Sequence, residues 1–213
     1  MAPPLRLLAP GDPLLGSSTD LGVARRAVAA VTVDDPAVTD ARALILRWID
    51  EHPDALQRTC TAGHLTGSAL VVDAEGRRIA LLRHRKLRRW LQPGGHADGE
   101  ANLAATALRE ATEETGIEGL RVAVPAVDLD VHRVEPPGEA PHLHLDVRYL
   151  VIAPPAARLR GNHESTGLLW VAPGDLAAYG VDDGLRRLVA GGLRQVAPFV
   201  ARVRPADERS EVD

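Results

Sequence analysis

Hydrophobic residues recur at helical spacing in two segments of the first quarter of the chain. In residues 24–31, and again in residues 40–51 (DARALILRWIDE), apolar side chains return every three or four positions. This period is typical of a helix with one buried face. Asp40 is a suitable N-terminal cap for the second helix, and His52-Pro53 would end it. We therefore predict two helices before the main domain.

Beyond these helices the pattern changes to the alternation typical of strands. The segments GHLTGSALVVD and RRIALLRH flank a predicted turn at residues 74–76, and RRWLQPGG adds a short strand. VAVPAVDLDVHRV, HLHLDVRYLVIA and GLLWVAP are further predicted strands. Helices are expected over residues 101–115, with Gly116 as C-terminal cap, and over residues 183–203. This order of elements predicts an α/β fold with a mixed β-sheet.

The pattern also divides the chain. Residues 1–57 are predicted to be an N-terminal arm and helical extension, in which residues 1–20, rich in Pro, Gly and Leu without a period, form an irregular segment. Residues 58–204 form the main domain, and residues 205–213 a C-terminal tail.

Composition narrows the class of partner. The 213 residues are 45% hydrophobic and 25% charged, as in a soluble globular protein, and the net charge of -4 argues against nucleic acid or an anionic membrane as partner. Cys60 is the only cysteine, which excludes a disulfide framework and suits a reducing cytoplasm. No apolar run approaches about 18 residues. We expect a cytoplasmic protein, without a membrane span or signal peptide, that acts on a small molecule.

Three glutamates gather near the end of the helix predicted over residues 101–115. Glu110, Glu113 and Glu114 are three or four positions apart, so they share a face and repel one another by a few tenths of a kcal/mol per pair. The helix macrodipole adds to this penalty. A hard divalent cation, Mg²⁺ or Mn²⁺, would remove both penalties, because such ions prefer oxygen ligands. An acidic surface is the alternative, since glutamate is a good helix former.

The residues around this cluster resemble the signature of the Nudix hydrolases. That signature is Gly, five residues, Glu, seven residues, then Arg-Glu, an aliphatic, any residue, Glu-Glu, any residue, Gly and an aliphatic. REATEETGI at residues 109–117 matches its second half, and Gly95 stands at its first position. Ala101 occupies the place of the first glutamate, with Glu100 one position early, and Ala111 is smaller than the usual aliphatic residue. We call residues 95–117 the box.

The resemblance covers residues 63–176 and implies a Nudix α/β/α sandwich with metal-dependent hydrolase activity. It implies that Glu110 and Glu114 are the main ligands of Mg²⁺ or Mn²⁺, with Glu113 and the Gly95 carbonyl completing the site. Such ions clamp the oxygens of a diphosphate and polarise a water for in-line attack at phosphorus.

Two further roles follow from the resemblance. Arg109 would pair with a box carboxylate and orient it, and a surface salt bridge is the alternative. The catalytic base varies in position within the family. Glu113 is the first candidate and Glu164 the second, although Glu164 is equally well explained as an ordinary loop carboxylate.

Polar side chains alternate with apolar ones in two later strands, VDLDVH at residues 127–132 and HLHLDVRY at residues 142–149. A period of two puts each polar set on one face, and the sets combine if the strands pair. We interpret this surface as a wall of the substrate cleft; a solvated face and a second metal site at His142 and His144 are the alternatives. The substrate-binding candidates here and beside the box glycines are Asp130, His132, His142, His144, Arg148 and His96.

A basic run, RHRKLRR at residues 83–89, precedes the box. It would steer an anionic diphosphate toward the metal ions, with Arg85 and Arg89 as candidate substrate contacts. A solvated loop explains the individual side chains equally well, and a nucleic-acid patch is the weakest interpretation.

These patterns predict a pyrophosphohydrolase that cleaves a nucleoside diphosphate linked to another moiety. A diphosphate isomerase would need a catalytic cysteine, and Cys60 lies outside the box. A ligand sensor without turnover is the other alternative, but sensors of this kind tend to have lost box carboxylates that are retained here. Trp48 and the N-terminal helices suit a dimer contact, a lid or the core, and a homodimer is compatible with the sequence.

Overall fold

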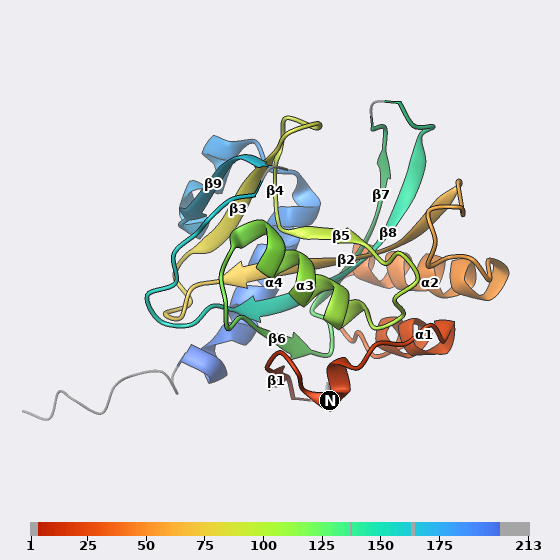
Figure 1. Cartoon of the computed structure of the whole chain (residues 1–213), viewed down its shortest axis with the longest axis horizontal. Coiled ribbons are helices and arrows are strands. Elements are labelled where there is room, and N and C mark those ends of the chain that lie inside the picture. Colours follow the sequence, from red (N-terminus) through yellow and green to blue (C-terminus); the bar gives the residue numbers. More distant parts are fainter. Residues whose placement is uncertain (1–3, 137, 163–164, 201–213) are drawn as a thin grey trace, which may run out of the picture.

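The computed structural model describes residues 4–136, 138–162 and 165–200 (Figure 1). The helices are α1 (Leu21–Ala29), α2 (Pro36–Glu51), α3 (Leu103–Thr115) and α4 (Asp183–Val200), with short 3-10 helices η1 (Pro13–Leu15) and η2 (Pro173–Tyr179). The strands are β1 (Arg6–Leu8), β2 (Gly63–Val72), β3 (Ile79–His84), β4 (Trp90–Leu91), β5 (Gly94–His96), β6 (Arg121–Val124), β7 (Asp128–Val134), β8 (His142–Ile152) and β9 (Ser165–Val171).

The described strands form one mixed sheet. Its main path is β1-β6-β8-β2-β3-β4, and β5, β7 and β9 pair with β2, β8 and β3 respectively. β2 and β8 run parallel along their whole length, from Gly63 opposite Leu143 to Val72 opposite Ile152, whereas the other pairs are antiparallel. The predicted mixed sheet is confirmed.

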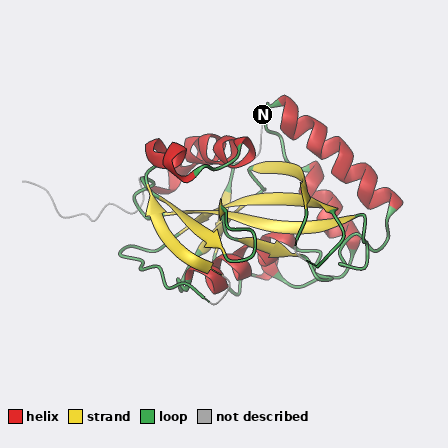
Figure 2. Cartoon of the chain, turned by 90° about the horizontal axis from the view of Figure 1, so that it is seen from above, coloured by secondary structure: helices red, strands yellow, loops and turns green. Residues whose placement is uncertain are grey.

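Helices cover both faces of this sheet (Figure 2). On β2, Gly67 lies against the first turns of α3, close to the Leu103 carbonyl oxygen, whereas Leu70 points the other way, to Gly192 of α4. Side chains alternate between the two faces of a strand, so each face has its own apolar core. One core joins the sheet to α1, α2 and α3, and the other joins it to α4. This arrangement is the predicted α/β/α sandwich, with the N-terminal helices packed onto it.

The N-terminal arm is more regular than predicted. Residues Arg6–Leu8 form β1, which pairs antiparallel with β6. Leu8 is 2% exposed, so its burial and the free backbone groups at the edge of β6 order a segment too short to show a period of its own. The prediction of an irregular segment is wrong for these residues.

The start of α2 also differs from the prediction. The helix begins at Pro36, and the Asp35 carboxylate caps it by accepting a hydrogen bond from the Ala37 N–H at 2.9 Å. Proline suits this first position because its missing N–H would have no partner there. Asp40 therefore lies inside the helix, and its prediction as the cap is wrong. The predicted stop is confirmed, since α2 ends at Glu51.

The segment predicted as one strand from VAVPAVDLDVHRV forms two. β6 ends at Val124, the Val124–Pro125 peptide bond is cis, and β7 begins at Asp128. Proline has no N–H for a strand ladder, so it separates the two strands. Both nevertheless pair with β8.

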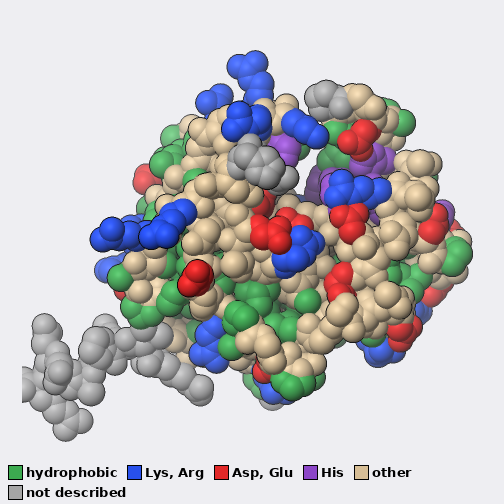
Figure 3. Space-filling view, viewed as in Figure 1, with side chains coloured by type: hydrophobic (Ala, Val, Ile, Leu, Met, Phe, Trp, Pro, Cys, Tyr) green, Lys and Arg blue, Asp and Glu red, His purple; other side chains and the backbone are tan. Residues whose placement is uncertain are grey.

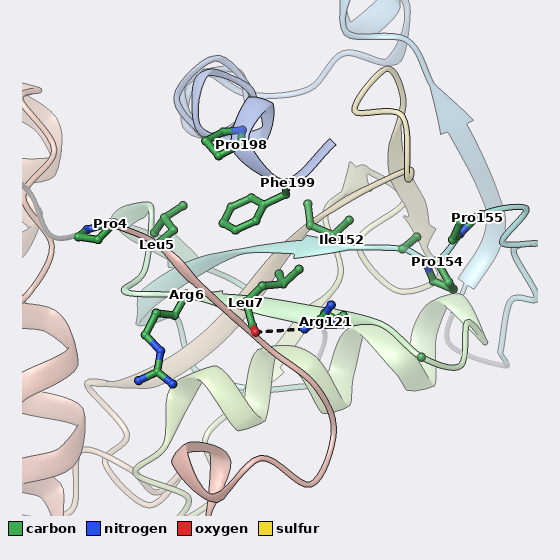
Figure 4. Close-up of a pocket in the computed structure, with 12 residues that line it drawn as sticks. Pro4, Leu5, Arg6, Leu7, Arg121, Ile152, Pro154, Pro155, Pro198 and Phe199 are labelled. Carbon is green, nitrogen blue, oxygen red and sulfur yellow. Dashed lines mark hydrogen bonds between the residues drawn. The ribbon is translucent and has the colours of Figure 1, made fainter. Parts of the chain in front are cut away.

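An apolar cavity of about 680 Å³ lies where the two ends of the described chain meet (Figure 4). Leu5 and Leu7 of the arm, Ile152 at the end of β8 and Phe199 of α4 contribute to its lining, and Arg121 donates a hydrogen bond to the Leu7 carbonyl at 3.4 Å. The lining contains no acidic residue or histidine, so the cavity lacks the groups for the predicted chemistry. None of the described helices is long and apolar enough to span a membrane.

Candidate metal centre and active site

The box folds as strand, loop and helix. β5 carries Gly94 and Gly95 beside β2, and α3 follows after a short loop. Asn102 caps α3 through its side-chain oxygen, which accepts a hydrogen bond from the Ala105 N–H, and Gly116 ends the helix in the left-handed conformation at φ 62°. Glycine adopts this conformation without steric cost. The predicted C-terminal cap is therefore confirmed, and the caps fix the helix that carries the three glutamates.

The two glycines of β5 lie directly against two of these carboxylates. A Cβ atom at Gly95 would collide with the carboxylate of Glu110, so glycine lets the backbone approach this carboxylate without displacing it. The Gly94 N–H donates a hydrogen bond to Glu114 Oε2 at 2.9 Å, and Glu114 is only 4% exposed. Strand and helix thus meet at the carboxylates that the sequence predicts as the main metal ligands.

Arg109 pairs with two of these carboxylates. Its Nη1 lies 2.8 Å from Glu110 Oε1 and 3.3 Å from Glu113 Oε2. The Glu113 side chain is 55% exposed, whereas that of Glu110 is 14% exposed. The guanidinium therefore holds an inner and an outer carboxylate together, which is the contact expected of a residue that orients metal ligands. Acidic and basic side chains gather in this region, over α3 (Figure 3).

The donor chemistry of the box suits a hard divalent cation. Three carboxylates from one helix would offer the oxygen ligands that Mg²⁺ and Mn²⁺ prefer. The bare backbone of Gly95 leaves no side chain between β5 and Glu110. Arg109 offsets only part of the negative charge of the cluster, because it contributes one positive charge against three carboxylates.

Glu100, one position before the place of the first signature glutamate, contacts the N-terminal arm. Its carboxylate accepts hydrogen bonds from the Ser17 hydroxyl at 2.5 Å, the Ser18 N–H at 2.9 Å and the Asn102 N–H at 2.7 Å. The next residue, Ala101, is fully buried. These contacts give Glu100 a structural role, fastening the arm to the loop before α3.

Three further residues were predicted to act at the box: Glu164, Arg85 and Arg89. Glu164, the second candidate base, lies outside the described residues. Arg85 and Arg89 are exposed on the β3–β4 connection, where Arg85 reaches the Ser165 carbonyl at 3.4 Å and Arg89 lies 3.4 Å from Asp182. Their predicted contact with substrate stays a prediction.

β7 and β8 pair, which is the condition under which their two polar sets combine. Asp128 stands opposite Arg148, Asp130 opposite Asp146, and His132 opposite His144. The polar residues of the two strands therefore share one face, the face of the sheet that also carries α4.

Most of the charged residues on this face belong to a buried ion-pair network. Arg148 is 3% exposed and lies 2.7 Å from Asp146, 3.3 Å from Asp128 and 3.0 Å from Asp130. Arg187 of α4 contacts Asp128 at 3.0 Å and Asp130 at 2.8 Å. A plain solvated face is wrong for these residues. Arg148 and Asp130 pair within the protein, and their predicted contact with substrate stays a prediction.

The network has opposite effects on two of its carboxyl groups. Burial raises the pKa of Asp128 above its ordinary value, although Arg187 and Arg148 oppose the shift. Burial acts in the same sense on Asp130, but hydrogen bonds and charges from His132, Arg148 and Arg187 outweigh it and hold its pKa below the usual range. Asp130 is therefore the more firmly ionised of the two, and it also holds His132 Nδ1 at 2.9 Å.

Beyond the network, toward the start of β2 and β8, the same face carries a group of histidines. His142 and His144, predicted on this surface, and His96, predicted beside the box glycines, meet His64 of β2. Burial is the main cause that lowers the pKa of His64, of His96 to about 4 and of His144 to about 2. These three rings are therefore neutral near pH 7. Histidine side chains line the hollow visible above α3 (Figure 3).

Sequence reasoning missed three residues of this region. His64 alternates with Thr66 and Ser68, so the polar period in GHLTGS was a usable signal, but its partners come from a distant strand. Arg187 lies on α4 and had no signal of its own. Arg58 makes two hydrogen bonds of 2.7 Å to Asp98, which hold the pKa of Asp98 below its usual range.

Comparison with solved structures gave several distant likenesses. A crystal structure of a NUDIX-family hydrolase from Clostridium perfringens is 21% identical over 63% of this chain and 97% of that chain, with a TM-score of 0.48. A C. elegans Ap4A hydrolase is 20% identical over 65% and 98%, with a TM-score of 0.45. The E. coli dihydroneopterin triphosphate pyrophosphohydrolase is 16% identical over 65% and 96%, with a TM-score of 0.47. Likenesses this distant carry no argument about substrate.

A search of curated proteins gave no significant match. The family model of the NUDIX domain matches residues 64–191, more than half of the chain, and these residues include the whole box and the strands that hold it. The chain belongs to the NUDIX family of hydrolases.

Proposed function

We propose that the protein is a divalent-cation-dependent pyrophosphohydrolase that cleaves the diphosphate bond of a nucleoside diphosphate linked to another moiety. The observation that supports this most is the packing of Gly95 against the Glu110 carboxylate, beside buried Glu114. Purely structural carboxylates at the end of a helix would gain from solvent exposure. These two are instead drawn in against a strand that has no side chain to cover them.

Each box residue has a distinct role in this proposal. Glu110 and Glu114 hold Mg²⁺ or Mn²⁺ together with the Gly95 carbonyl, and Glu113 adds an outer ligand. The cation, when bound, offsets the charge of the diphosphate and lowers the pKa of a coordinated water. Arg109 keeps Glu110 and Glu113 at a fixed separation, so the carboxylates need not reorganise when substrate arrives.

Glu113 is the proposed base that takes the proton from the attacking water. Its side chain is 55% exposed, so it can reach a water that stands between the box and the substrate. Attack by that water at phosphorus breaks the bond to the bridging oxygen and gives two phosphate-containing products.

The substrate side of the site is proposed from charge and exposure. Arg85 and Arg89, exposed and basic, would steer the diphosphate toward the box. His132, whose side chain is 39% exposed, is held by Asp130 and is available to contact the group beyond the diphosphate. A cytoplasmic location, a homodimer and a division at residues 57 and 204 belong to the same proposal.

Two alternatives are less well supported. An isomerase would need a reactive cysteine, but Cys60 is 5% exposed and burial raises the pKa of its thiol, which makes the thiolate scarce near neutral pH. A sensor without turnover would have no use for Arg109 bridging two box carboxylates.

The test is phosphate release from a panel of nucleoside diphosphate compounds, coupled to a phosphatase where needed, with Mg²⁺ or Mn²⁺ and after chelation. Glu114→Gln should lower the rate by about 10²–10³-fold, because it removes charge that stabilises the transition state through the cation. Glu118→Gln is the matched control, an exposed glutamate just beyond the box, and should retain the wild-type rate.

The outcomes separate the candidate functions. Cation-dependent turnover that is lost only in Glu114→Gln supports the hydrolase, and the best compound identifies the substrate group. Binding of a nucleotide compound without turnover, equal in wild type and Glu114→Gln, would replace the hydrolase with a sensor.

A further inference from the structure

Four imidazole rings converge on the face of the sheet opposite the box helix. One ligand nitrogen from each of His64, His96, His142 and His144 lies within 4.8 Å of the other three. The ring centroids of His64 stand 4.9 Å from those of His96 and His142, and 5.4 Å from that of His144. Among the described residues this is the one cluster of histidine, cysteine or acidic side chains with such spacing.

The sheet register builds the cluster. His64 of β2 stands opposite His144 of β8 in the parallel pair, and His142 is the next residue of β8 on the same face. His96 of β5 stands opposite Thr66, the residue that follows His64 on this face of β2. Three strands that are far apart in sequence thus contribute rings to one point, so the cluster does not arise from a single repetitive segment.

Hydrogen bonds orient two of the rings. His142 Nδ1 lies 2.9 Å from the Ala140 carbonyl, and His64 Nδ1 lies 3.4 Å from the Cys60 carbonyl. A carbonyl only accepts, so each Nδ1 carries the proton and each Nε2 has a free lone pair. Metal-binding histidines are commonly held in this way, with the other ring N–H donated to a backbone carbonyl.

The free nitrogens have no partner. Nε2 of His64, His142 and His144 is buried, and each lacks a hydrogen bond within the described part of the chain. His64 is 4% and His142 is 7% exposed. A buried polar atom left without a partner typically costs about 1–3 kcal/mol. Three such atoms at one point indicate that a bound group, which is not part of the protein chain, accepts their lone pairs.

We propose that His64, His96, His142 and His144 bind one transition-metal ion, with Zn²⁺ as the best fit. Imidazole nitrogen is a good ligand for Zn²⁺ and a poor one for Mg²⁺ and Ca²⁺, which prefer oxygen. Zn–N bonds of about 2.0–2.1 Å place tetrahedral ligand atoms about 3.3 Å apart. The rings need only modest rotation to close from their present spacing.

Four protein ligands complete a tetrahedron, so this is a structural site rather than a catalytic one. It ties β5 to β2 and β8 from the side opposite α3. Its ligand His96 follows Gly95 directly, so the ion stabilises the strand on which the box glycines lie. Arg58 lies near enough to both sites that its charge acts on Glu110 as well as on His64 and His96. The proposal does not depend on the function proposed for the box.

The test is Zn²⁺ binding to the full-length protein after removal of metal with a chelator, measured by calorimetry and by elemental analysis of the dialysed protein. Titrations contain a large excess of Mg²⁺ to occupy the box. Wild type and Glu110→Gln should each bind one equivalent. His144→Ala and His64→Gln should weaken binding by more than about 100-fold, since even the outer partners of a ligand contribute about 10–100-fold.

His52→Ala is the matched control, because His52 stacks on Trp48 and is not one of the four clustered histidines, and it should bind as wild type does. Co²⁺ gives a second reading in the unmutated protein, where strong visible absorption reports tetrahedral nitrogen ligands without any variant having to fold. The proposal is overturned if metal-free wild type binds no Zn²⁺ in the presence of Mg²⁺. It is equally overturned if Glu110→Gln abolishes the binding, or if folded His144→Ala binds as tightly as wild type.

Discussion

Two clusters of candidate metal ligands lie on opposite sides of one short strand. On one side of β5, Gly95 meets the Glu110 carboxylate of α3, and on the other side His96 joins three more imidazoles. The box cluster is acidic and partly open to solvent, and its carboxylates come from a single helix. The histidine cluster is largely buried and comes from three strands. Adjacent residues of a strand can thus serve two sites of different chemistry, because their side chains point to opposite faces.

The two clusters differ in how far the sequence alone can predict them. Carboxylates three and four positions apart on a helix must be neighbours, so local spacing is enough to predict their site. Histidines on separate strands become neighbours only through the register of the sheet. On the histidine side, the ion-pair network around Arg148 joins β7, β8 and α4, whereas on the box side the Gly94 backbone contacts the Glu114 carboxylate.

The largest expected effect is on stability, from Arg148→Ala. Removal of this guanidinium leaves buried Asp146 without its charged partner and leaves Asp128 with Arg187 alone, and breaking such a buried pair typically costs about 3–5 kcal/mol. Urea unfolding at pH 7 measures the loss. Arg186→Ala is the control, because Arg186 is exposed and its ion pair with exposed Asp183 is long, at 3.9 Å. Equal free energies of unfolding in the two variants would show that the ion-pair network does not stabilise the histidine face of the sheet.

Next in size is the effect of Gly95→Ala on catalysis. The added Cβ would displace the Glu110 carboxylate, and misplacement of about 1 Å in a catalytic group can cost about 100-fold in rate. The rate of diphosphate hydrolysis should fall by about this factor, while Zn²⁺ binding at the histidines continues. Gly174→Ala, where a Cβ meets no atom within 4 Å, should leave the rate unchanged. If Gly95→Ala hydrolyses the diphosphate at the wild-type rate, the proposal that Glu110 binds the metal ion is wrong.

Arg109→Ala should have a smaller effect. It leaves the ligands in place but removes the contact that orients Glu110 and Glu113, and loss of such an outer partner typically lowers activity by about 10–100-fold. We expect the lower end, because Arg109 is 47% exposed. The cation concentration that gives half the maximal rate should rise as well. If only stability changes, and by less than about 1 kcal/mol, Arg109 is a surface salt bridge.

The smallest effect is expected from Glu100→Gln. Its hydrogen bonds to Ser17 and Ser18 fasten the arm, so the variant should lose about 1 kcal/mol of stability. Its rate of hydrolysis should stay close to that of wild type. A loss of activity comparable to that of Glu114→Gln would instead make Glu100 the replacement for the glutamate missing at position 101.

The sequence predicted the parts of the fold that depend on local signals. The box helix, its cap at Gly116, the β2–β3 hairpin and the polar face of each of β7 and β8 all follow from spacing within short segments. β1 was missed because three residues are too few to show a period, and the start of α2 was misplaced because Asp35-Pro36 was the stronger capping signal.

The residues of the candidate site were likewise predicted only where local spacing or the family signature identified them. Glu110, Glu114 and Arg109 were found from helical spacing and a family signature. His64 and Arg187 were not, because each acts through contacts with strands far away in the sequence. The burial of Arg148 among three carboxylates was not predicted, because burial cannot be read from alternation alone.

The most direct test of the metal-dependent account is Mn²⁺ binding to the metal-free protein, followed by electron paramagnetic resonance and without any substrate. The account predicts that wild type, Glu118→Gln and His144→Ala bind Mn²⁺ alike, whereas Glu114→Gln loses most of the binding. Unchanged Mn²⁺ binding in Glu114→Gln would contradict it, because the carboxylates packed against β5 would then not be the cation site.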